Sequence, residues 1–280
     1  MHNKLIQSSE LQLIVDEPDT VIFDCRHEIN NPEYGVTSYR KGHIPNAIFA
    51  CVDNDLSKEP NGVNGRHPLP DTHVLCDWLN KCGVTNTTQV VAYDDSGGVY
   101  ASRLWWLLKW LGHDAVAVLD GGIQDWEDTS GEIDTNTSQG RLKGKFKINP
   151  KDILVDTRFI MKELYRHNLV IIDARANDRF LGLNETIDPV AGHIPGAVNR
   201  FFRNNLNQAG KFLGEKELKA SFRHIIGSTP SHEVIHQCGS GVTACHNLLA
   251  MELAGLKNSK LYPGSWSEWI SDPRRPISTD

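Results

Sequence analysis

Short apolar runs rich in β-branched residues alternate along this chain with longer stretches in which apolar residues recur at helical spacing. In the second half, Val170–Asp173 and Val234–Gln237 have the pattern of buried strands, and Leu261 ends another. Residues 244–253 carry apolar side chains every three or four positions, and Gly255 is positioned to end that helix. The pattern predicts an α/β fold in which parallel sheets are flanked by helices.

The second half of the chain repeats the first. Four pairs of segments match in the same order: VIFDCRHE at 21–28 with VIIDARAN at 170–177, YRKGHIPNAI at 39–48 with PVAGHIPGAV at 189–198, VAYDDSGGVYASRLWWLLKWLG at 91–112 with VIHQCGSGVTACHNLLAMELAG at 234–255, and LDGGIQDW at 119–126 with YPGSWSEW at 262–269. Because the order is kept, the chain contains two copies of one unit. A length of 280 residues also suits two domains.

A polar stretch separates the two copies. Residues 127–150, EDTSGEIDTNTSQGRLKGKFKINP, contain almost no large aliphatic side chain, which is typical of a surface connection. We therefore predict a first domain over 1–130, a linker over 131–148 and a second domain over 149–280.

Charge and hydropathy limit the classes of partner. With 29 Lys and Arg against 35 Asp and Glu, the formal charge is -6, so we expect neither nucleic acid nor an anionic membrane as a partner. The amino-terminal apolar run, 11–15, is too short for a signal peptide. The run LWWLLKWL at 104–111 is too short to span a bilayer and predicts a buried helix. We expect a cytoplasmic protein.

One of the six cysteines stands out when the two copies are aligned. The chain has no CxxC pair, and five of the thiols, those of Cys25, Cys51, Cys76, Cys82 and Cys245, are expected to be reduced thiols in a core. The sixth, Cys238, aligns with Asp95 of the first copy, since 238 − 95 = 143 and the flanking segments keep the same offset, 234 − 91 = 143. One copy therefore has a thiol where the other has a carboxylate.

The setting of Cys238 favours a reactive thiolate. It closes the predicted strand VIHQ and opens the loop CGSGVT, with two glycines, directly before a helix. Such a loop can turn several backbone N–H groups toward one centre, and the helix N-terminus adds partial positive charge. Both features stabilise an anion, including the thiolate form of a cysteine.

Three kinds of cysteine chemistry fit this loop poorly. A cysteine phosphatase or arsenate reductase needs an Arg six residues after the Cys, and position 244 is Ala. A protease or acyl transferase needs a general base, and His236 cannot be placed as one from the sequence. Thioredoxin-type exchange needs CxxC. A single nucleophile among backbone amides is suited to carrying sulfur as a persulfide anion.

The loop CGSGVT, the paired GHIPNA and GHIPGA, the DAR at 173–175 and the closing YPGSWSEW resemble the tandem rhodanese family of sulfurtransferases over nearly the whole chain. The resemblance implies two tandem rhodanese-like domains, with the nucleophile in the second and an Asp in its place in the first. Loops of the type CRKGVT, which suit the dianion thiosulfate, belong to thiosulfate enzymes. CGSGVT is similar to the loop of the 3-mercaptopyruvate type.

The resemblance also implies the substrate contacts. The hydroxyls of Ser240 and Thr243 would face the donor, and the backbone would approach it at the remaining loop residues, Gly239, Gly241 and Val242. Arg175 would bind the donor carboxylate, and Arg179 is the nearest candidate for a second cation. Many relatives carry an acidic-Pro-Arg segment before the second GHIP, where this chain has NETIDPV at 184–190.

Polar residues in the repeated motifs have structural explanations. His43 and His193, in the two GHIP copies, are expected to fix turns by hydrogen bonding, and Asp24 and Asp173 to brace the turn after a strand. We assign a catalytic role to none of the four.

The expected reaction moves sulfur from 3-mercaptopyruvate through a Cys238 persulfide to a thiol, a thioredoxin-like protein or cyanide, with no metal or organic cofactor. A thiosulfate sulfurtransferase remains an alternative. A non-catalytic binding module is a third possibility, which the first copy alone would suggest and the intact Cys238 loop opposes.

Overall fold

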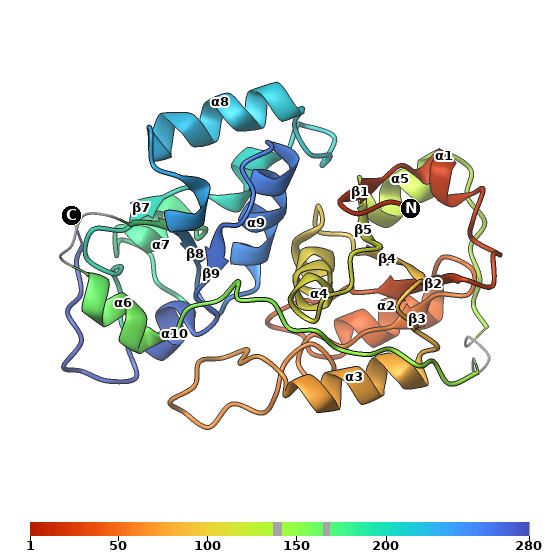
Figure 1. Ribbon diagram of the computed structural model, residues 1–280, viewed down its shortest axis with the longest axis horizontal. Coiled ribbons are helices and arrows are strands. Elements are labelled where there is room, and N and C mark those ends of the chain that lie inside the picture. Colours follow the sequence, from red (N-terminus) through yellow and green to blue (C-terminus); the bar gives the residue numbers. More distant parts are fainter. Residues whose placement is uncertain (137–141, 165–168, 280) are drawn as a thin grey trace. The chain divides into compact units, whose positions relative to one another are not determined.

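The computed structural model describes residues 1–136, 142–164 and 169–279 (Figure 1). The chain forms two compact units. Unit 1 comprises Met1–Lys58, Leu69–Asp152 and Gln208–Phe212, and unit 2 comprises Glu59–Pro68, Ile153–Asn207 and Leu213–Asp280. The sequence places the division at a linker over 131–148, of which residues 137–141 lie outside the described residues. The sequence gives no indication that the segment 59–68 belongs to unit 2 or that the segment 208–212 belongs to unit 1.

Unit 1 contains a parallel sheet of five strands in the order β1-β5-β4-β2-β3. Its elements are β1 (Leu5–Ile6), α1 (Ser8–Leu11), β2 (Thr20–Asp24), α2 (Tyr34–Lys41), β3 (Ile48–Phe49), α3 (Thr72–Lys81), β4 (Gln89–Tyr93), α4 (Val99–Trp110), β5 (Val116–Leu119) and α5 (Gly122–Asp128). The central strands β2, β4 and β5 are buried along their whole length, as continuous apolar runs in a parallel sheet predict.

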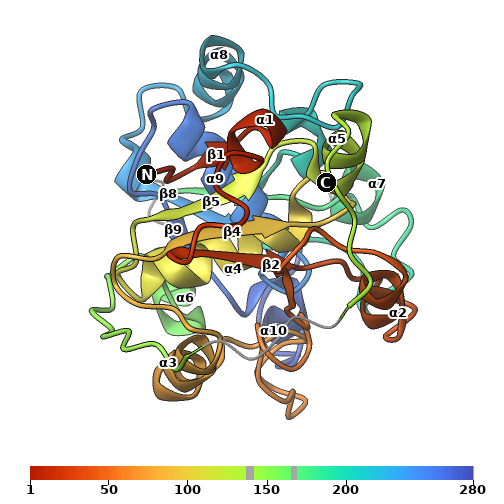
Figure 2. The same cartoon turned by 90° about the vertical axis from the view of Figure 1, so that its right-hand side faces the viewer.

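Helices cover both faces of this sheet. Figure 2 shows α1 and α5 on one side of the strands and α3 and α4 on the other. Ile22 and Val91 of the sheet pack in one buried cluster with Ile123 and Trp126 of α5. On the opposite face, the ring of Phe23 lies 5.1 Å from that of Trp78 in α3. Alternate residues of a strand therefore serve two separate helix layers.

Unit 2 repeats the plan with a parallel sheet of four strands in the order β7-β6-β8-β9. Its elements are α6 (Thr157–Glu163), β6 (Val170–Asp173), α7 (Asn177–Phe180), β7 (Val198–Asn199), the 3₁₀ helix η1 (Phe202–Asn205), α8 (Glu215–Ile226), the 3₁₀ helix η2 (Ser231–Glu233), β8 (Val234–Gln237), α9 (Thr243–Leu253), β9 (Lys260–Leu261) and α10 (Ser265–Trp269). In Figure 1, α8 and α9 lie on one side of these strands, and α6 and α10 lie on the other.

The predicted elements are confirmed. The strands at 170–173 and 234–237 are β6 and β8, and Leu261 ends β9. Helix α9 ends at Leu253, and Gly255 follows it with φ +73°, a left-handed conformation that suits glycine. The apolar run 104–111 lies largely in α4, a buried helix. Within the described ranges, no helix is long and apolar enough to cross a bilayer.

The sheet of unit 2 sets the place of the site. β6 and β8 are hydrogen-bonded parallel neighbours, with Asp173 opposite Gln237. Because parallel strands end at the same edge, the turns that carry Arg175 and Cys238 lie side by side there. Ligands of open α/β sheets bind outside this carboxyl edge.

Candidate active site

Cys238 is the first residue after β8 and is buried, with 2% of its surface exposed. Its Sγ accepts a hydrogen bond from the backbone N–H of Gly241, at an N···S distance of 3.1 Å. The loop therefore turns back on itself so that an amide points at the sulfur, as the glycine spacing predicts. This geometry stabilises negative charge on the sulfur.

Gly241 is needed for this turn. Its φ is +80°, and a Cβ atom at this position would lie 2.4 Å from the backbone oxygen of Pro263. A side chain would both strain the backbone and collide with a neighbouring peptide. The second glycine, Gly239, has a different reason, since a Cβ there would lie 2.8 Å from Nη2 of Arg66.

The first residues of α10 support the loop. Ser265 Oγ accepts the N–H of Cys238 at 3.1 Å. In return, the N–H groups of Trp266 and Ser267 donate to the carbonyls of Cys238 and Gly239 at 3.0 and 2.9 Å. These contacts give the closing motif YPGSWSEW a physical role, because they fix the backbone on either side of the nucleophile.

The remaining loop residues connect Cys238 to α9 and to the segment 59–68. Val242 is the residue before α9 and Thr243 is its first residue. Ser240 Oγ lies 2.7 Å from Nδ1 of His67, and both groups are buried. No local signal in the sequence marks His67 as a site residue, because 173 positions separate the two partners.

Arg175 lies beside the loop, and each nitrogen of its guanidinium bonds to a group of the protein. Its guanidinium donates to both carboxylate oxygens of Asp173, to the carbonyl of Gly192 and to Glu185, and 1% of its side chain is exposed. Unit 1 contains the same arrangement, in which Arg26 donates to Asp24 and to the carbonyl of Gly42. Since unit 1 has Asp95 where unit 2 has Cys238, this repeated contact favours a bracing role for Arg175 over the carboxylate contact that the resemblance implies.

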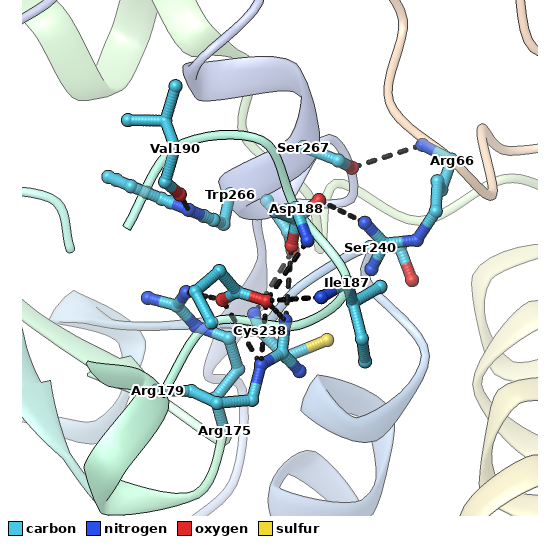
Figure 3. A network of polar contacts seen from close by, with 12 residues as sticks. Arg66, Arg175, Arg179, Ile187, Asp188, Val190, Cys238, Ser240, Trp266 and Ser267 are labelled. Atoms are coloured by element: carbon cyan, nitrogen blue, oxygen red, sulfur yellow. Dashed lines mark hydrogen bonds and ion pairs between the residues drawn. The ribbon is translucent and has the colours of Figure 1, made fainter. Parts of the chain in front are cut away.

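Arg179 is more open than Arg175, with 17% of its side chain exposed. It donates to Glu185 at 2.8 Å and to Asp188 at 3.1 Å (Figure 3). Burial raises the pKa of Glu185, but the hydrogen bonds from Arg179 and from backbone amides outweigh burial and hold that pKa below its ordinary value. Burial raises the pKa of Asp188 above its ordinary value, although Arg66 and Arg179 oppose the shift.

Unit 1 fills the corresponding loop with its own carboxylate. Asp94 accepts four backbone N–H groups, those of Ser96, Gly98, Tyr100 and Ala101, at 2.8 to 2.9 Å. Asp95, which aligns with Cys238, accepts instead from the hydroxyl of Tyr34. The amides that could bind an external anion in unit 1 are therefore already bonded.

In unit 2 the residue that aligns with Asp94 is Gln237, since 237 − 94 = 143 and the flanking strands keep that offset, 234 − 91 = 143. Its side-chain oxygen and nitrogen are buried and have no hydrogen-bond partner among the described residues. A neutral carboxamide does not compete for the loop amides as a carboxylate does. The pair of positions 94 and 237 thus distinguishes the two loops as clearly as the pair 95 and 238.

The histidines and aspartates of the repeated motifs make the structural contacts that the sequence predicts. His43 Nδ1 lies 2.7 Å from the carbonyl of Tyr39, and His193 Nδ1 lies 2.8 Å from that of Phe180, as expected for turn-fixing residues. Asp24 and Asp173 accept the N–H two residues on, as predicted. Cys25, Cys82 and Cys245 are buried, but the expectation of a core position is wrong for Cys51 and Cys76, which are half-buried.

His236 lies in the core rather than beside the nucleophile. It is fully buried, with Nε2 3.0 Å from Sδ of Met251 and its ring against Phe222. Burial, with a smaller contribution from Arg200, lowers the pKa of His236 to about 3. It is therefore neutral at neutral pH and is not placed to act as a base for Cys238.

This burial predicts an acid-sensitive fold. The unfolded state takes up a proton on His236 near pH ~6.5, whereas the folded state does so only at about 3, so stability is lost as pH falls between these values. We expect this residue to reduce the free energy of unfolding by up to about 1.4 kcal/mol per pH unit there. Urea unfolding, followed by tryptophan fluorescence at several pH values, measures the slope.

Replacing His236→Leu should flatten that slope, and the matched change His224→Gln on the exposed surface of α8 should leave it intact. An unchanged slope in the His236 variant would show that other groups carry the dependence.

Two segments of the chain match the model of the rhodanese-like domain, residues 7–129 and 147–272. The sequence is 45% identical over 279 residues to a probable 3-mercaptopyruvate sulfurtransferase of Pseudomonas aeruginosa, covering 99% of this chain and 98% of the relative. It is 36% identical over 276 residues to a putative thiosulfate sulfurtransferase of Mycobacterium tuberculosis, covering 98% and 96%.

Solved structures agree with these relatives. A 3-mercaptopyruvate sulfurtransferase from Leishmania major superimposes with a TM-score of 0.84 at 31% identity, over 99% of this chain and 76% of that one. A 3-mercaptopyruvate sulfurtransferase from Escherichia coli gives 0.82 at 28% identity, over 95% and 99%.

Proposed function

Since the chain belongs to the rhodanese-like family and is a sulfurtransferase, we propose that it takes sulfur from 3-mercaptopyruvate, carries it as a persulfide on Cys238 and passes it to a thiol. The observation that carries this proposal is the hydrogen bond from the Gly241 amide to Cys238 Sγ. Ser265, at the start of α10, fixes the same loop by accepting the N–H of Cys238. Similarity to 3-mercaptopyruvate sulfurtransferases over the whole chain supports the choice of donor.

The transfer has two steps. The Cys238 thiolate attacks the donor sulfur, the carbon–sulfur bond breaks, and its electron pair leaves on the enolate of pyruvate. The proton of the donor thiol ends on the methyl group of pyruvate, so the persulfide keeps one negative charge. A thiolate acceptor then attacks the outer sulfur and releases the Cys238 thiolate.

The loop supplies the groups that these steps need. The Gly241 amide stabilises charge at the sulfur that carries the persulfide. We assign to the Ser240 hydroxyl, which pairs with His67, a hydrogen bond to the donor oxygen. These groups are fixed before the donor arrives, which lowers the reorganisation that the reaction requires.

We assign the donor carboxylate to Arg179 rather than to Arg175. Arg179 has more exposed surface, and its Nη2 lies 3.7 Å from the position of a Cβ atom on Gly239, beside the nucleophile. Arg175 would have to leave Asp173 and Glu185 to bind a donor. Its pairing with Asp173 is the same as that of Arg26 with Asp24 in unit 1.

The acceptor is assigned by class. A small thiol, a reduced thioredoxin-like protein or cyanide can each attack the outer sulfur of a persulfide, and we place the enzyme in the cytoplasm, where thiols are kept reduced. A thiosulfate donor is the second candidate, because one of the full-length relatives is named a putative thiosulfate sulfurtransferase.

Initial rates with the two donors test this assignment. We expect a higher kcat/KM with 3-mercaptopyruvate than with thiosulfate, and one additional sulfur atom on the peptide that carries Cys238. Arg179→Gln should lower kcat/KM for 3-mercaptopyruvate by roughly 10- to 100-fold, because a charge-assisted hydrogen bond to the carboxylate is lost.

Arg175→Gln is the matched comparison, since it removes the same charge four residues earlier in the chain. We expect it to lower the thermal stability, as the pair with Asp173 is buried. Full activity in Arg179→Gln, with a loss confined to kcat/KM in Arg175→Gln, would return the carboxylate contact to Arg175. Sulfur on any other cysteine would contradict the proposed function.

A further inference from the structure

A second arginine reaches the nucleophile loop from the segment 59–68. Arg66 Nη2 lies 2.8 Å from the position of a Cβ atom on Gly239, the residue after Cys238. Its Nε is buried without a hydrogen-bond partner among the described residues. A buried guanidinium nitrogen without an acceptor is costly, and Nη2 of the same guanidinium lies beside the loop, where a bound ligand would accept hydrogen bonds.

Asp188 bridges Arg66 and Arg179. One carboxylate oxygen bonds to Nη1 of Arg66 and the other to Nη2 of Arg179 at 3.1 Å, as Figure 3 shows. The carboxylate has 2% of its side chain exposed. A nitrogen of each guanidinium lies near Gly239. Asp188, between them, accepts a hydrogen bond from each.

The charges beside the loop are balanced. Three cations face three anions there: Arg66, Arg175 and Arg179 against Asp173, Glu185 and Asp188. Without the carboxylate of Asp188 this group would carry one positive charge more. In a desolvated site each uncompensated charge changes the binding of an ion strongly, so Asp188 controls how much negative charge a donor can bring.

The Arg66 side chain borders open space. Arg66 and Asp188 line a pocket of about 300 Å³ together with Ser267 and Ile270. The backbone N–H of Arg66 is held by Ser267 Oγ at 3.0 Å, so the main chain is fixed while the long side chain borders open space. Because Nη2 already lies beside Gly239, the guanidinium can contact a donor there without a shift of the main chain.

We infer that Arg66 is the second cation for the donor carboxylate and that Asp188 sets the charge of the site, so that it selects donors with one negative charge over dianions. The inference rests on the proposed function and identifies what determines donor choice. 3-Mercaptopyruvate brings one carboxylate, which Arg66 and Arg179 can share. Thiosulfate brings a second charge, for which the balanced group offers no further cation.

Charge-changing variants, assayed with both donors, test the inference. Asp188→Asn should lower the ratio of kcat/KM for 3-mercaptopyruvate to that for thiosulfate by about tenfold, because the added positive charge favours the dianion. Arg66→Gln should raise KM for 3-mercaptopyruvate by about tenfold with little change in kcat. It should lower kcat/KM for thiosulfate by a larger factor, because the dianion loses more from the missing positive charge. The double variant restores the charge balance, so its donor ratio should return to within about threefold of the parent's.

This return separates a charge effect from structural damage, which would grow in the double variant. Glu217→Gln, which removes one negative charge from the exposed surface of α8, should leave the donor ratio unchanged. If Asp188→Asn folds poorly, the KM effect of Arg66→Gln and the ratio in the double variant still decide.

The outcomes distinguish this inference from the proposed function. A parent protein that forms no Cys238 persulfide with either donor would overturn both. A parent that prefers 3-mercaptopyruvate, with an unchanged ratio in Asp188→Asn and an unchanged KM in Arg66→Gln, would overturn the inference and leave the proposed function standing.

Discussion

Cys238→Ser should abolish sulfur transfer, with a loss of at least ~10⁴-fold in kcat, because the hydroxyl replaces the sulfur that must carry the persulfide. The side chains are nearly isosteric, and the Gly241 amide can donate to the new oxygen as it does to Sγ. We therefore expect the variant to fold normally. Steady-state rates with 3-mercaptopyruvate measure the loss of turnover. The intact mass after incubation with donor shows whether a sulfur atom is added.

Asp95→Ala is the matched control in unit 1, since Asp95 aligns with Cys238 but bonds to the Tyr34 hydroxyl rather than to the loop amides. It should leave kcat/KM within about twofold of the parent's, because it touches no reacting group. Appreciable turnover by Cys238→Ser would remove the chemical basis of the assignment, and a large loss in Asp95→Ala would give unit 1 a part in the reaction.

Gly241→Ala should be the most damaging single change in the loop that keeps the nucleophile. At φ +80° an alanine is strained, and its Cβ would lie 2.4 Å from the Pro263 oxygen, so the peptide must shift. The shift moves the N–H away from Cys238 Sγ. We expect a cost of roughly 2–4 kcal/mol in stability and a loss of about 10²- to 10³-fold in the rate of persulfide formation.

Gly255→Ala tests the same strain without the collision. This glycine has φ +73°, but the nearest atom to its Cβ position is Glu215 Oε1 at 3.8 Å. A cost of about 1 kcal/mol in stability and unchanged chemistry are expected. Equal losses of activity in the two variants would mean that general destabilisation, rather than the amide contact, explains the effect of Gly241→Ala.

The sequence was sufficient for the features that depend on local pattern and on repetition. Strands β6 and β8 follow from apolar runs, and α9 follows from helical spacing closed by Gly255. The nucleophile loop was accessible because the two copies could be aligned and differ at positions 95 and 238. These signals lie within short stretches of the sequence, and each occurs in both copies of the unit.

The contacts around the loop depend on long-range packing and were not accessible in the same way. Ser240 meets His67, and Asp188 meets Arg66, across 173 and 122 positions. The segment 59–68 has no helical or strand period that would place it in unit 2. For Arg175 the sequence placed the residue in the right turn, but it could not show that Nε and Nη2 bond to Asp173 and to the Gly192 carbonyl, a contact that unit 1 repeats.

The way Asp94 is bonded in unit 1 bears on how two copies of one ancestral gene could diverge. After duplication, a single mutation of Asp95 to cysteine would place a thiol at a loop whose amides remain bonded to Asp94, so it would gain little reactivity. At least two substitutions, at Asp94 and at Asp95, are therefore needed before the first copy could present a reactive thiol. The Asp94 carboxylate thus keeps a cysteine that arises at position 95 from becoming a second reactive sulfur.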